Sequence, residues 1–150
     1  METEINEKLS DVMDIFLADN SSNVPLPLLT FSLSCGFPSP SIDHIEKKID
    51  LNEVLINHPN ATYFGRAKGK SMINAGIEDG DLLVIDRSIE PKDGKIILCY
   101  INGEFTVKLL SMEKNKIILK PYNNNYSQIE IENFDDFQVW GVVTHIIKSV

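Results

Sequence analysis

The sequence predicts a mainly β protein in which one folded domain follows an extended N-terminal arm. Short runs rich in β-branched and aromatic residues, each bounded by Gly, Asn, Pro or Asp, are typical of strands. They cover residues 62–67, 81–86, 95–101, 105–111, 116–119 and 137–148. Asn102-Gly103 is a strong signal for a two-residue β-hairpin between two of these runs. At 150 residues the chain is long enough for one domain and too short for two of typical size.

The arm, residues 1–35, is predicted to begin with a short amphipathic helix. Apolar residues recur at helical spacing over residues 5–17, and acids occupy the opposite face. This helix either packs against the body of the domain or docks into a groove of a partner. Residues 20–23 are all Asn or Ser, and Pro25 and Pro27 follow, so the helix is expected to end before them.

The chain from Val24 to Pro40 is predicted to be extended, because its prolines limit helix formation. Within it, Cys35-Gly36 places a small side chain before a peptide bond and none after it, which lets the backbone come close to a nucleophile. Taken alone, the pair is equally compatible with a simple turn. A second short helix is expected over residues 42–50, capped by Ser41.

Residues 68–86 carry the candidate nucleophile, Ser71. Gly69 lets other backbone come close to it, and a polar turn at residues 78–81 leads into the apolar run 82–85, which has the length of a strand. On its own such a stretch is more often an ordinary turn than a catalytic site, because both Gly and Ser are favoured in turns.

Lys108 is the second candidate residue and follows Ser71 by 37 positions. In the predicted strand 105–111, side-chain alternation places Lys108 on the same face as Thr106, next to apolar neighbours. A strand lysine is also a common way of blunting an exposed sheet edge. The residue pattern alone therefore does not decide between a catalytic and a surface lysine.

Several spaced motifs resemble those of a known family. They are GKSM at 69–72, GIEDGDLLVID at 76–86 and GEFTVKLL at 103–110, with CGFPSP at 35–40, IDLN at 49–52 and HPNATYF at 58–64 upstream. The first three are similar to the S24 family of self-cleaving Ser-Lys peptidases, the LexA/UmuD family, and the upstream three resemble its UmuD branch. The resemblance covers about residues 35–148, and the first 30 or so residues do not carry it.

The resemblance implies a folded, mainly antiparallel sheet and a homodimer. It implies an autocatalytic serine peptidase with Ser71 and Lys108 as its catalytic dyad and Cys35-Gly36 as its cleavage site. Cleavage would remove residues 1–35 and leave residues 36–150 as the dimerising peptidase domain. The arm has no room for the helix-turn-helix domain of LexA-type repressors, so we expect no operator binding.

The resemblance also implies a role in the SOS response to DNA damage. In the UmuD branch, RecA nucleoprotein filaments prompt the cut. The processed dimer then joins a UmuC-like, Y-family subunit in an error-prone translesion DNA polymerase.

The chemistry requires a neutral Lys108, because only an uncharged amine accepts the proton of a serine hydroxyl. Burial among apolar neighbours disfavours an ammonium group, and nearby cationic residues act in the same direction. Thr106 is the candidate to hydrogen-bond the amine and orient it. The backbone N–H groups of Ser71 and Lys70 are the simplest donors for the oxyanion.

The composition argues against several other functions. The net charge is −8, of which the arm contributes −5 through six acids and Lys8, so no direct DNA binding is expected. No apolar run approaches the roughly 20 residues of a membrane span, and the N-terminus is acidic where a signal peptide is basic. A cytoplasmic protein without membrane contact is expected. Two cysteines and three histidines lack metal-ligand spacing, so we expect no metal and no cofactor.

A rival hypothesis is a non-enzymatic interaction module of the same fold. Its arm would only cover or expose a surface that regulates a polymerase or a repressor. The joint presence of Ser71, Lys108 and Cys35-Gly36 favours the peptidase.

Overall fold

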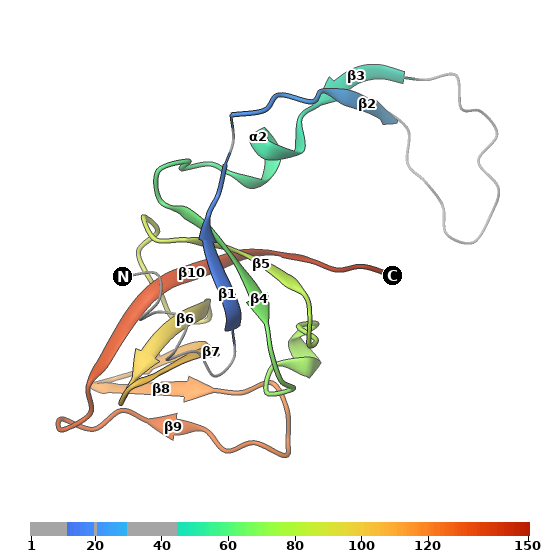
Figure 1. Ribbon diagram of the computed structural model, residues 1–150. Helices are drawn as coiled ribbons and strands as arrows, with labels where there is room; N and C mark the ends of the chain where they lie inside the picture. Colours follow the sequence, from blue (N-terminus) through green and yellow to red (C-terminus); the bar gives the residue numbers. More distant parts are fainter. Residues whose placement is uncertain (1–11, 20, 30–44) are drawn as a thin grey trace. The chain divides into compact units, whose positions relative to one another are not determined.

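The computed structural model describes residues 12–19, 21–29 and 45–150 of the chain (Figure 1). The chain divides into two compact units, one formed by Met1–Ala18 with His58–Val150 and the other by Asp19–Asn57. The first unit contains both candidate catalytic residues. The predicted cleavage site at Cys35-Gly36 and the expected cap Ser41 lie outside the described residues.

The described part of the first unit forms an eight-stranded antiparallel sheet, which confirms the predicted mainly β fold. Its strand order is β1-β4-β5-β10-β6-β7-β8-β9 (Figure 1). The strands are β1 (Val12–Leu17), β4 (Thr62–Ala67), β5 (Leu82–Asp86), β6 (Ile96–Ile101), β7 (Glu104–Glu113), β8 (Lys116–Lys120), β9 (Ile129–Glu130) and β10 (Phe137–Ile147). All six strands expected from the sequence are present, with bounds that agree to within two residues.

β10 joins the strands that lead to Ser71 with the strands that lead to Lys108. It pairs with β5 along one side and with β6 along the other. Gly141 lies in β10, and a Cβ there would lie 2.6 Å from Cγ2 of Ile85 in β5. A side chain at this position would require Ile85 or the β10 backbone to shift, so glycine allows their close approach.

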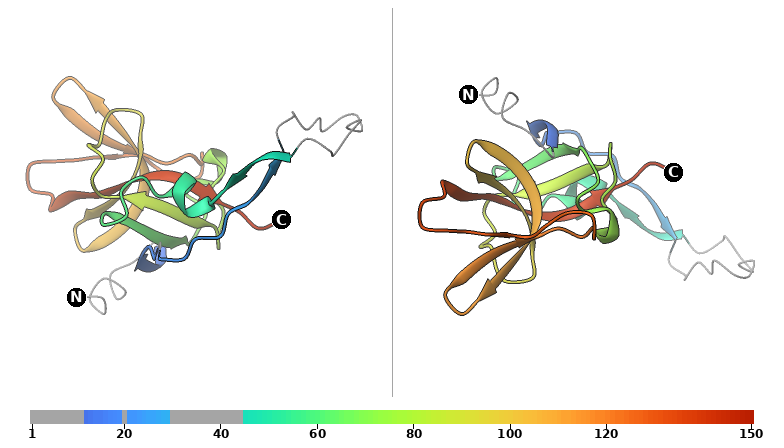
Figure 2. Two further views of the ribbon diagram at one scale, coloured as in Figure 1. Left: turned by 90° about the horizontal axis from the view of Figure 1, so that it is seen from above. Right: turned by 90° about the horizontal axis from the view of Figure 1, so that it is seen from below.

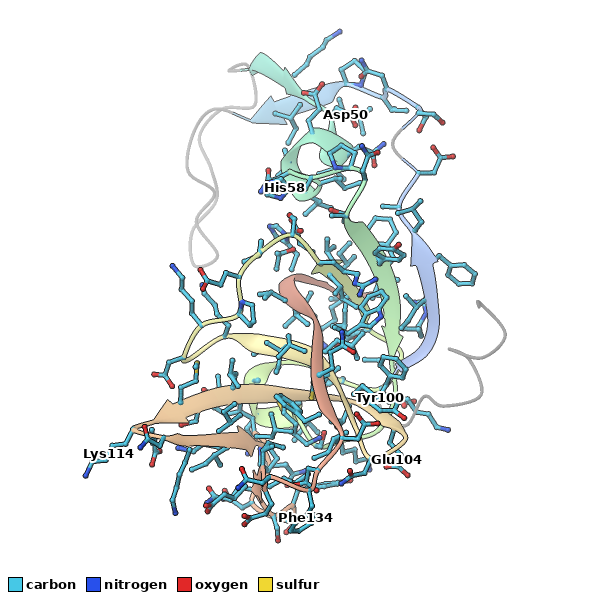
Figure 3. All side chains as sticks on the ribbon, turned by 90° about the vertical axis from the view of Figure 1, so that its left-hand side faces the viewer. Asp50, His58, Tyr100, Glu104, Lys114 and Phe134 are labelled. Atoms are coloured by element: carbon cyan, nitrogen blue, oxygen red, sulfur yellow. The ribbon has the colours of Figure 1, made fainter. Side chains whose placement is uncertain are left out.

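β7 carries Lys108 and is bounded by two tight turns. Asn102 and Gly103 have φ values of 48° and 95°, and they form the predicted two-residue turn between β6 and β7. Lys114, with φ of 51°, lies in the turn between β7 and β8. Figure 3 shows Glu104 and Lys114 at opposite ends of β7, and Figure 2 shows the β7–β8 hairpin extending away from β4 and β5.

Both faces of β7 are covered by apolar residues. Val107 belongs to one buried cluster, together with Met72 and Leu98, whereas Leu110 belongs to a second cluster with Val142. Successive strand residues point to opposite faces, so β7 is buried on both sides over most of its length. Because both faces of β7 are covered, a lysine side chain on this strand can be buried.

The second unit contains the hairpin of β2 (Leu26–Leu29) and β3 (Ile45–Ile49), followed by the helix α2 (Leu51–Leu55). The expected helix over residues 42–50 is therefore wrong in its described part, since residues 45–49 form a strand. The helix begins at Leu51 instead, because the side chain of Asp50 caps it there. This side chain accepts a hydrogen bond of 3.1 Å from the Asn52 N–H.

The expected helix over residues 5–17 is also wrong where the structure describes it. Residues 12–17 form β1, which runs antiparallel to β4 along the edge of the sheet (Figure 1). Ile15 packs against the apolar cluster that contains Val107, and the buried Ala18 donates a backbone hydrogen bond of 2.9 Å to Thr62. Pairing with the open β4 edge satisfies the backbone of this segment, and this long-range pairing outweighs the helical spacing of its apolar residues.

Candidate active site

Ser71 lies in the loop that connects β4 to the short 3-10 helix η1 (Ile73–Ala75). The loop is held by backbone hydrogen bonds between Ala67 and the turn at residues 78–81, with distances of 2.7 Å and 2.8 Å. The N–H of Gly69 donates to Oδ1 of Asp79 at 2.8 Å, and Gly69 has a φ of 89°, a value that favours glycine. These contacts fix the loop, and Ser71 is only 6% exposed.

Lys108 reaches Ser71 from β7. Nζ of Lys108 lies 3.1 Å from Oγ of Ser71, which is within the reach required of a general base. The amine also contacts Oγ1 of Thr106 at 2.7 Å and the carbonyl oxygen of Val107 at 3.1 Å. Lys108 is 6% exposed, as buried as the serine. The structure therefore brings together Ser71, Lys108 and Thr106, three of the residues that the sequence singled out.

A small pocket opens beside Ser71. Its volume is about 10 Å³, close to the space that one water molecule needs. Its lining combines the loop before the serine with apolar side chains: Ala67, Lys68, Gly69, Ser71, Met72, Ile77 and Val107. A pocket of this size has room for a small side chain next to the nucleophile.

An ion-pair cluster supports the turn that contacts the Ser71 loop. Lys148, just beyond β10, pairs with Asp81 and with Glu78, the latter at 2.8 Å. Burial raises the pKa of Asp81, but hydrogen bonds from Lys148 and from the Glu78 N–H outweigh it and hold the pKa below its ordinary value. The sequence around Lys148 gives no sign of this role, because its partner Asp81 lies 67 residues away.

Two other serines have different roles. Ser111 is buried and contacts Oε1 of Glu113 at 3.2 Å. Ser88 donates to Asp86 at 2.6 Å, and Asp86 in turn contacts Nδ1 of His58 at 2.6 Å. The carboxylate therefore lies between the hydroxyl and the imidazole. In this order the histidine does not receive the serine proton, so the cluster lacks the geometry of a catalytic triad.

Asn123 is a further residue whose role was not predicted from the sequence. It lies in the segment between β8 and β9 and contacts the Ser71 loop. Its side-chain N–H donates to the carbonyl oxygen of Lys70 at 2.8 Å. The sequence indicated only a loop at residues 123–125, and a single sequence holds no signal for this contact across 53 positions.

A buried serine that faces a lysine amine on an antiparallel sheet defines a candidate Ser-Lys peptidase. The model of the Peptidase S24-like family matches residues 27–144. The chain therefore belongs to this family, as a UmuD-like member of the LexA/UmuD group. No helix in the described part of the chain is both long and apolar enough to cross a membrane.

Curated relatives match nearly the whole chain. Protein MucA of Salmonella typhimurium is 38% identical over 135 residues, which cover 89% of this chain and 92% of the relative. Protein SamA of Salmonella typhimurium is 43% identical, over 82% of this chain and 85% of the relative. The LexA repressor of Bordetella parapertussis is 32% identical, and the match covers 83% of this chain but only 56% of the repressor.

Proposed function

We propose that the protein is a serine peptidase that cuts its own chain between Cys35 and Gly36, with Ser71 as nucleophile and Lys108 as general base. The observation that carries this proposal is the 3.1 Å separation of Lys108 Nζ and Ser71 Oγ inside a buried site. Burial disfavours charged groups. A lysine amine accepts a proton only in its uncharged form, which a buried site favours. Family membership supports the same reaction.

The reaction has two proton-transfer cycles. Lys108 takes the proton of Ser71 Oγ as that oxygen attacks the carbonyl carbon of Cys35, and backbone N–H groups of the serine loop receive the negative charge on the carbonyl oxygen. Lys108 then gives the proton to the nitrogen of Gly36, which leaves as a new N-terminus. In the second cycle a water molecule loses a proton to Lys108 and attacks the ester. Lys108 returns this proton to Ser71 Oγ as the ester bond breaks, which restores the serine hydroxyl and the neutral amine and releases the new carboxyl group of Cys35.

The site also favours the proposed bond. The pocket beside Ser71 is small, in keeping with the short side chain of Cys35. The residue after the bond, Gly36, has no side chain to obstruct the attacking oxygen. The seated arm would also exclude water from the dyad and so strengthen its electrostatic interactions.

The likeness to UmuD-type proteins supports a cellular role. We infer that the protein acts in the cytoplasm, that a RecA nucleoprotein filament prompts the cut, and that the product of residues 36–150 is a homodimer. This dimer would then act as a subunit beside a UmuC-like, Y-family polymerase in SOS mutagenesis. The match over most of the length of MucA and SamA supports this role over that of a repressor.

The experiment is to incubate the purified protein with and without an activated RecA filament and to measure the product by mass spectrometry. We expect a fragment of 115 residues that begins at Gly36, and none from Ser71→Ala. A folded wild-type protein that yields no such fragment under either condition would instead support the rival function, a non-enzymatic interaction module of this fold.

A further inference from the structure

The segment between β8 and β9 is joined to the active-site loop at two points that bracket Ser71. The side-chain N–H of Asn123 donates to the carbonyl oxygen of Lys70 at 2.8 Å. The carbonyl oxygen of Tyr122 accepts a hydrogen bond of 2.8 Å from the N–H of Asn74. One contact precedes the nucleophile in the chain and the other follows it. The loop that carries the serine is thus held by a segment about 50 positions further along the chain.

The side chain of Asn123 is itself held in one orientation. Its Oδ1 accepts a hydrogen bond of 3.0 Å from the N–H of Asn125, so its NH₂ group is the end that faces Lys70. The two ends of a side-chain amide differ, since only the nitrogen donates and only the oxygen accepts. Asparagine satisfies both neighbours at once, whereas aspartate would place a second acceptor against the Lys70 carbonyl.

The contact on Lys70 decides where the N–H of Ser71 points. The described residues contain no cis peptide bond, and in a trans peptide the C=O and the following N–H point in opposite directions. Asn123 and the N–H of Ile73, the latter at 3.3 Å, both hold the Lys70 carbonyl. None of the described residues accepts a hydrogen bond from the Ser71 N–H, which leaves this donor available to a substrate.

We propose that Asn123 is a positioning residue for the oxyanion site: by holding the Lys70 carbonyl, it aims the Ser71 N–H at the oxygen that becomes negatively charged. The inference rests on the proposed self-cleavage. If the Lys70–Ser71 peptide rotated, a carbonyl oxygen would replace the donor, and that oxygen would repel the developing charge. Asn123 acts on the transition state through this peptide, and it does not touch the Ser71–Lys108 pair.

Four proteins test the proposal. Asn123→Ala removes the donor, and Asn123→Asp replaces it with an acceptor of the same size. Asn125→Asp is the matched control, since it adds the same charge two positions away and keeps the backbone N–H that holds Asn123. The wild-type protein completes the set. For each protein the self-cleavage rate is measured across pH, together with the thermal unfolding temperature.

A second readout separates the oxyanion site from the nucleophile. In a Ser71→Cys background, alkylation by iodoacetamide at position 71 is followed by peptide mass spectrometry, with and without Asn123→Ala. Alkylation transfers a carbon group to sulfur without forming an oxyanion, so it depends on the nucleophile and its base but not on the Ser71 N–H. A merely structural role of Asn123 would change alkylation and cleavage together.

We expect Asn123→Ala to lower the cleavage rate at high pH by about tenfold to a hundredfold, and Asn123→Asp by at least as much. Deleting an oxyanion donor outright lowers the rate by about 10²- to 10³-fold. A smaller or equal loss is expected here, because Asn123→Ala keeps the Ser71 N–H and only removes the contact that orients it. The midpoint of the pH profile and the alkylation rate should stay unchanged, and Asn125→Asp should cleave like the wild type. Wild-type cleavage by Asn123→Ala, or a parallel fall of cleavage and alkylation, would overturn the inference. A wild-type protein that does not cleave at all would overturn the proposed function, and this inference with it.

Discussion

Thr106 and Lys108, two positions apart on β7, place Oγ1 and Nζ only 2.7 Å apart, which is closer than the 3.1 Å between Nζ and Ser71 Oγ. Both side chains are buried on the same face of the strand. The threonine hydroxyl therefore holds the amine in the position from which it reaches the serine. A rigid β-strand separates the two residues by a fixed distance, so this relationship is built into β7.

Replacing Thr106 by valine should slow self-cleavage, because valine keeps the shape of threonine but loses the hydroxyl that orients the amine. We expect a loss of up to about 100-fold, the effect of misplacing a reacting group by about 1 Å. Thr106→Ser retains the hydroxyl and should keep most of the activity. The measurement is the rate of product formation for both variants, and equal rates would show that the amine needs no help from residue 106.

Lys108→Arg should be inactive at every pH, with or without an activator, since a guanidinium stays protonated throughout and cannot accept the proton of Ser71. The measurement is the yield of the 115-residue product, for Lys108→Arg and for the wild type. Residual cutting by Lys108→Arg would exclude Lys108 as the base.

The strands of this protein were predictable because their signals are local. Alternating β-branched residues predict strands, and Asn102-Gly103 predicts a hairpin turn, from only a few neighbouring positions. β1 was missed because its apolar residues fit a helix equally well, and a distant strand edge decided the outcome. β9 has only two residues and owes its existence to pairing with β8.

The candidate site was predictable only in part. Family motifs, not the residue pattern alone, singled out Ser71 and Lys108, and the structure adds the 3.1 Å separation. The contacts of Asn123 and Lys148 with the Ser71 loop and its supporting turn join segments that lie more than 50 positions apart. Such contacts depend on the course of the folded chain, so a single sequence carries no local sign of them.

Asp86 should contribute to stability in a pH-dependent way. Burial raises the pKa of Asp86, but hydrogen bonds from Ser88 and His58 outweigh it, and the net pKa lies below the ordinary value. The ionised form is therefore favoured in the folded state. Its stabilising effect is complete above the pKa of the unfolded chain, about 3.9, and is lost as pH falls through the folded pKa.

Asp86→Asn should accordingly lower the free energy of unfolding by about 1–3 kcal/mol at neutral pH, the usual effect of breaking a buried hydrogen-bonded group. The difference from the wild type should begin to shrink below about pH 4, where Asp86 of the unfolded chain becomes protonated, and should be lost below the folded pKa. Urea unfolding at pH 7 and pH 3 measures both effects. A difference that is the same at the two pH values would mean that the charge of Asp86 makes no contribution.

Gly36→Glu should abolish cutting with little loss of stability. A side chain at this position would obstruct the approach of Ser71 Oγ to the Cys35 carbonyl, whereas an arm position usually tolerates substitution within about 0.5 kcal/mol. Ser39→Glu, three positions along, is the matched control and should still be cut. Product formation by Gly36→Glu at the wild-type rate would place the scissile bond elsewhere.

The cut at Cys35-Gly36 should leave β1 held to the domain only by non-covalent contacts. β1 covers the edge of β4, Ile15 packs against the apolar cluster of the sheet, and Ala18 is buried. In contrast, Phe16 and Leu17 are 63% and 55% exposed, so much of the strand's apolar surface contributes little to its attachment. We therefore expect residues 1–35 to dissociate after cleavage and to expose the β4 edge.

A chain of residues 36–150 should remain folded and dimeric but less stable than uncut Ser71→Ala, by about 1–3 kcal/mol, the usual range for losing a few packed side chains. In a domain of about 100 residues each kcal/mol lowers the unfolding temperature by about 4–8 °C. A synthetic peptide of residues 1–35, added in excess, should restore part of this loss by re-pairing with β4, whereas the same peptide carrying Ile15→Asp should not. Calorimetry and analytical ultracentrifugation make the measurements. If the shortened chain precipitates or loses cooperative unfolding, β1 is an integral strand of the sheet and the arm is not a removable latch.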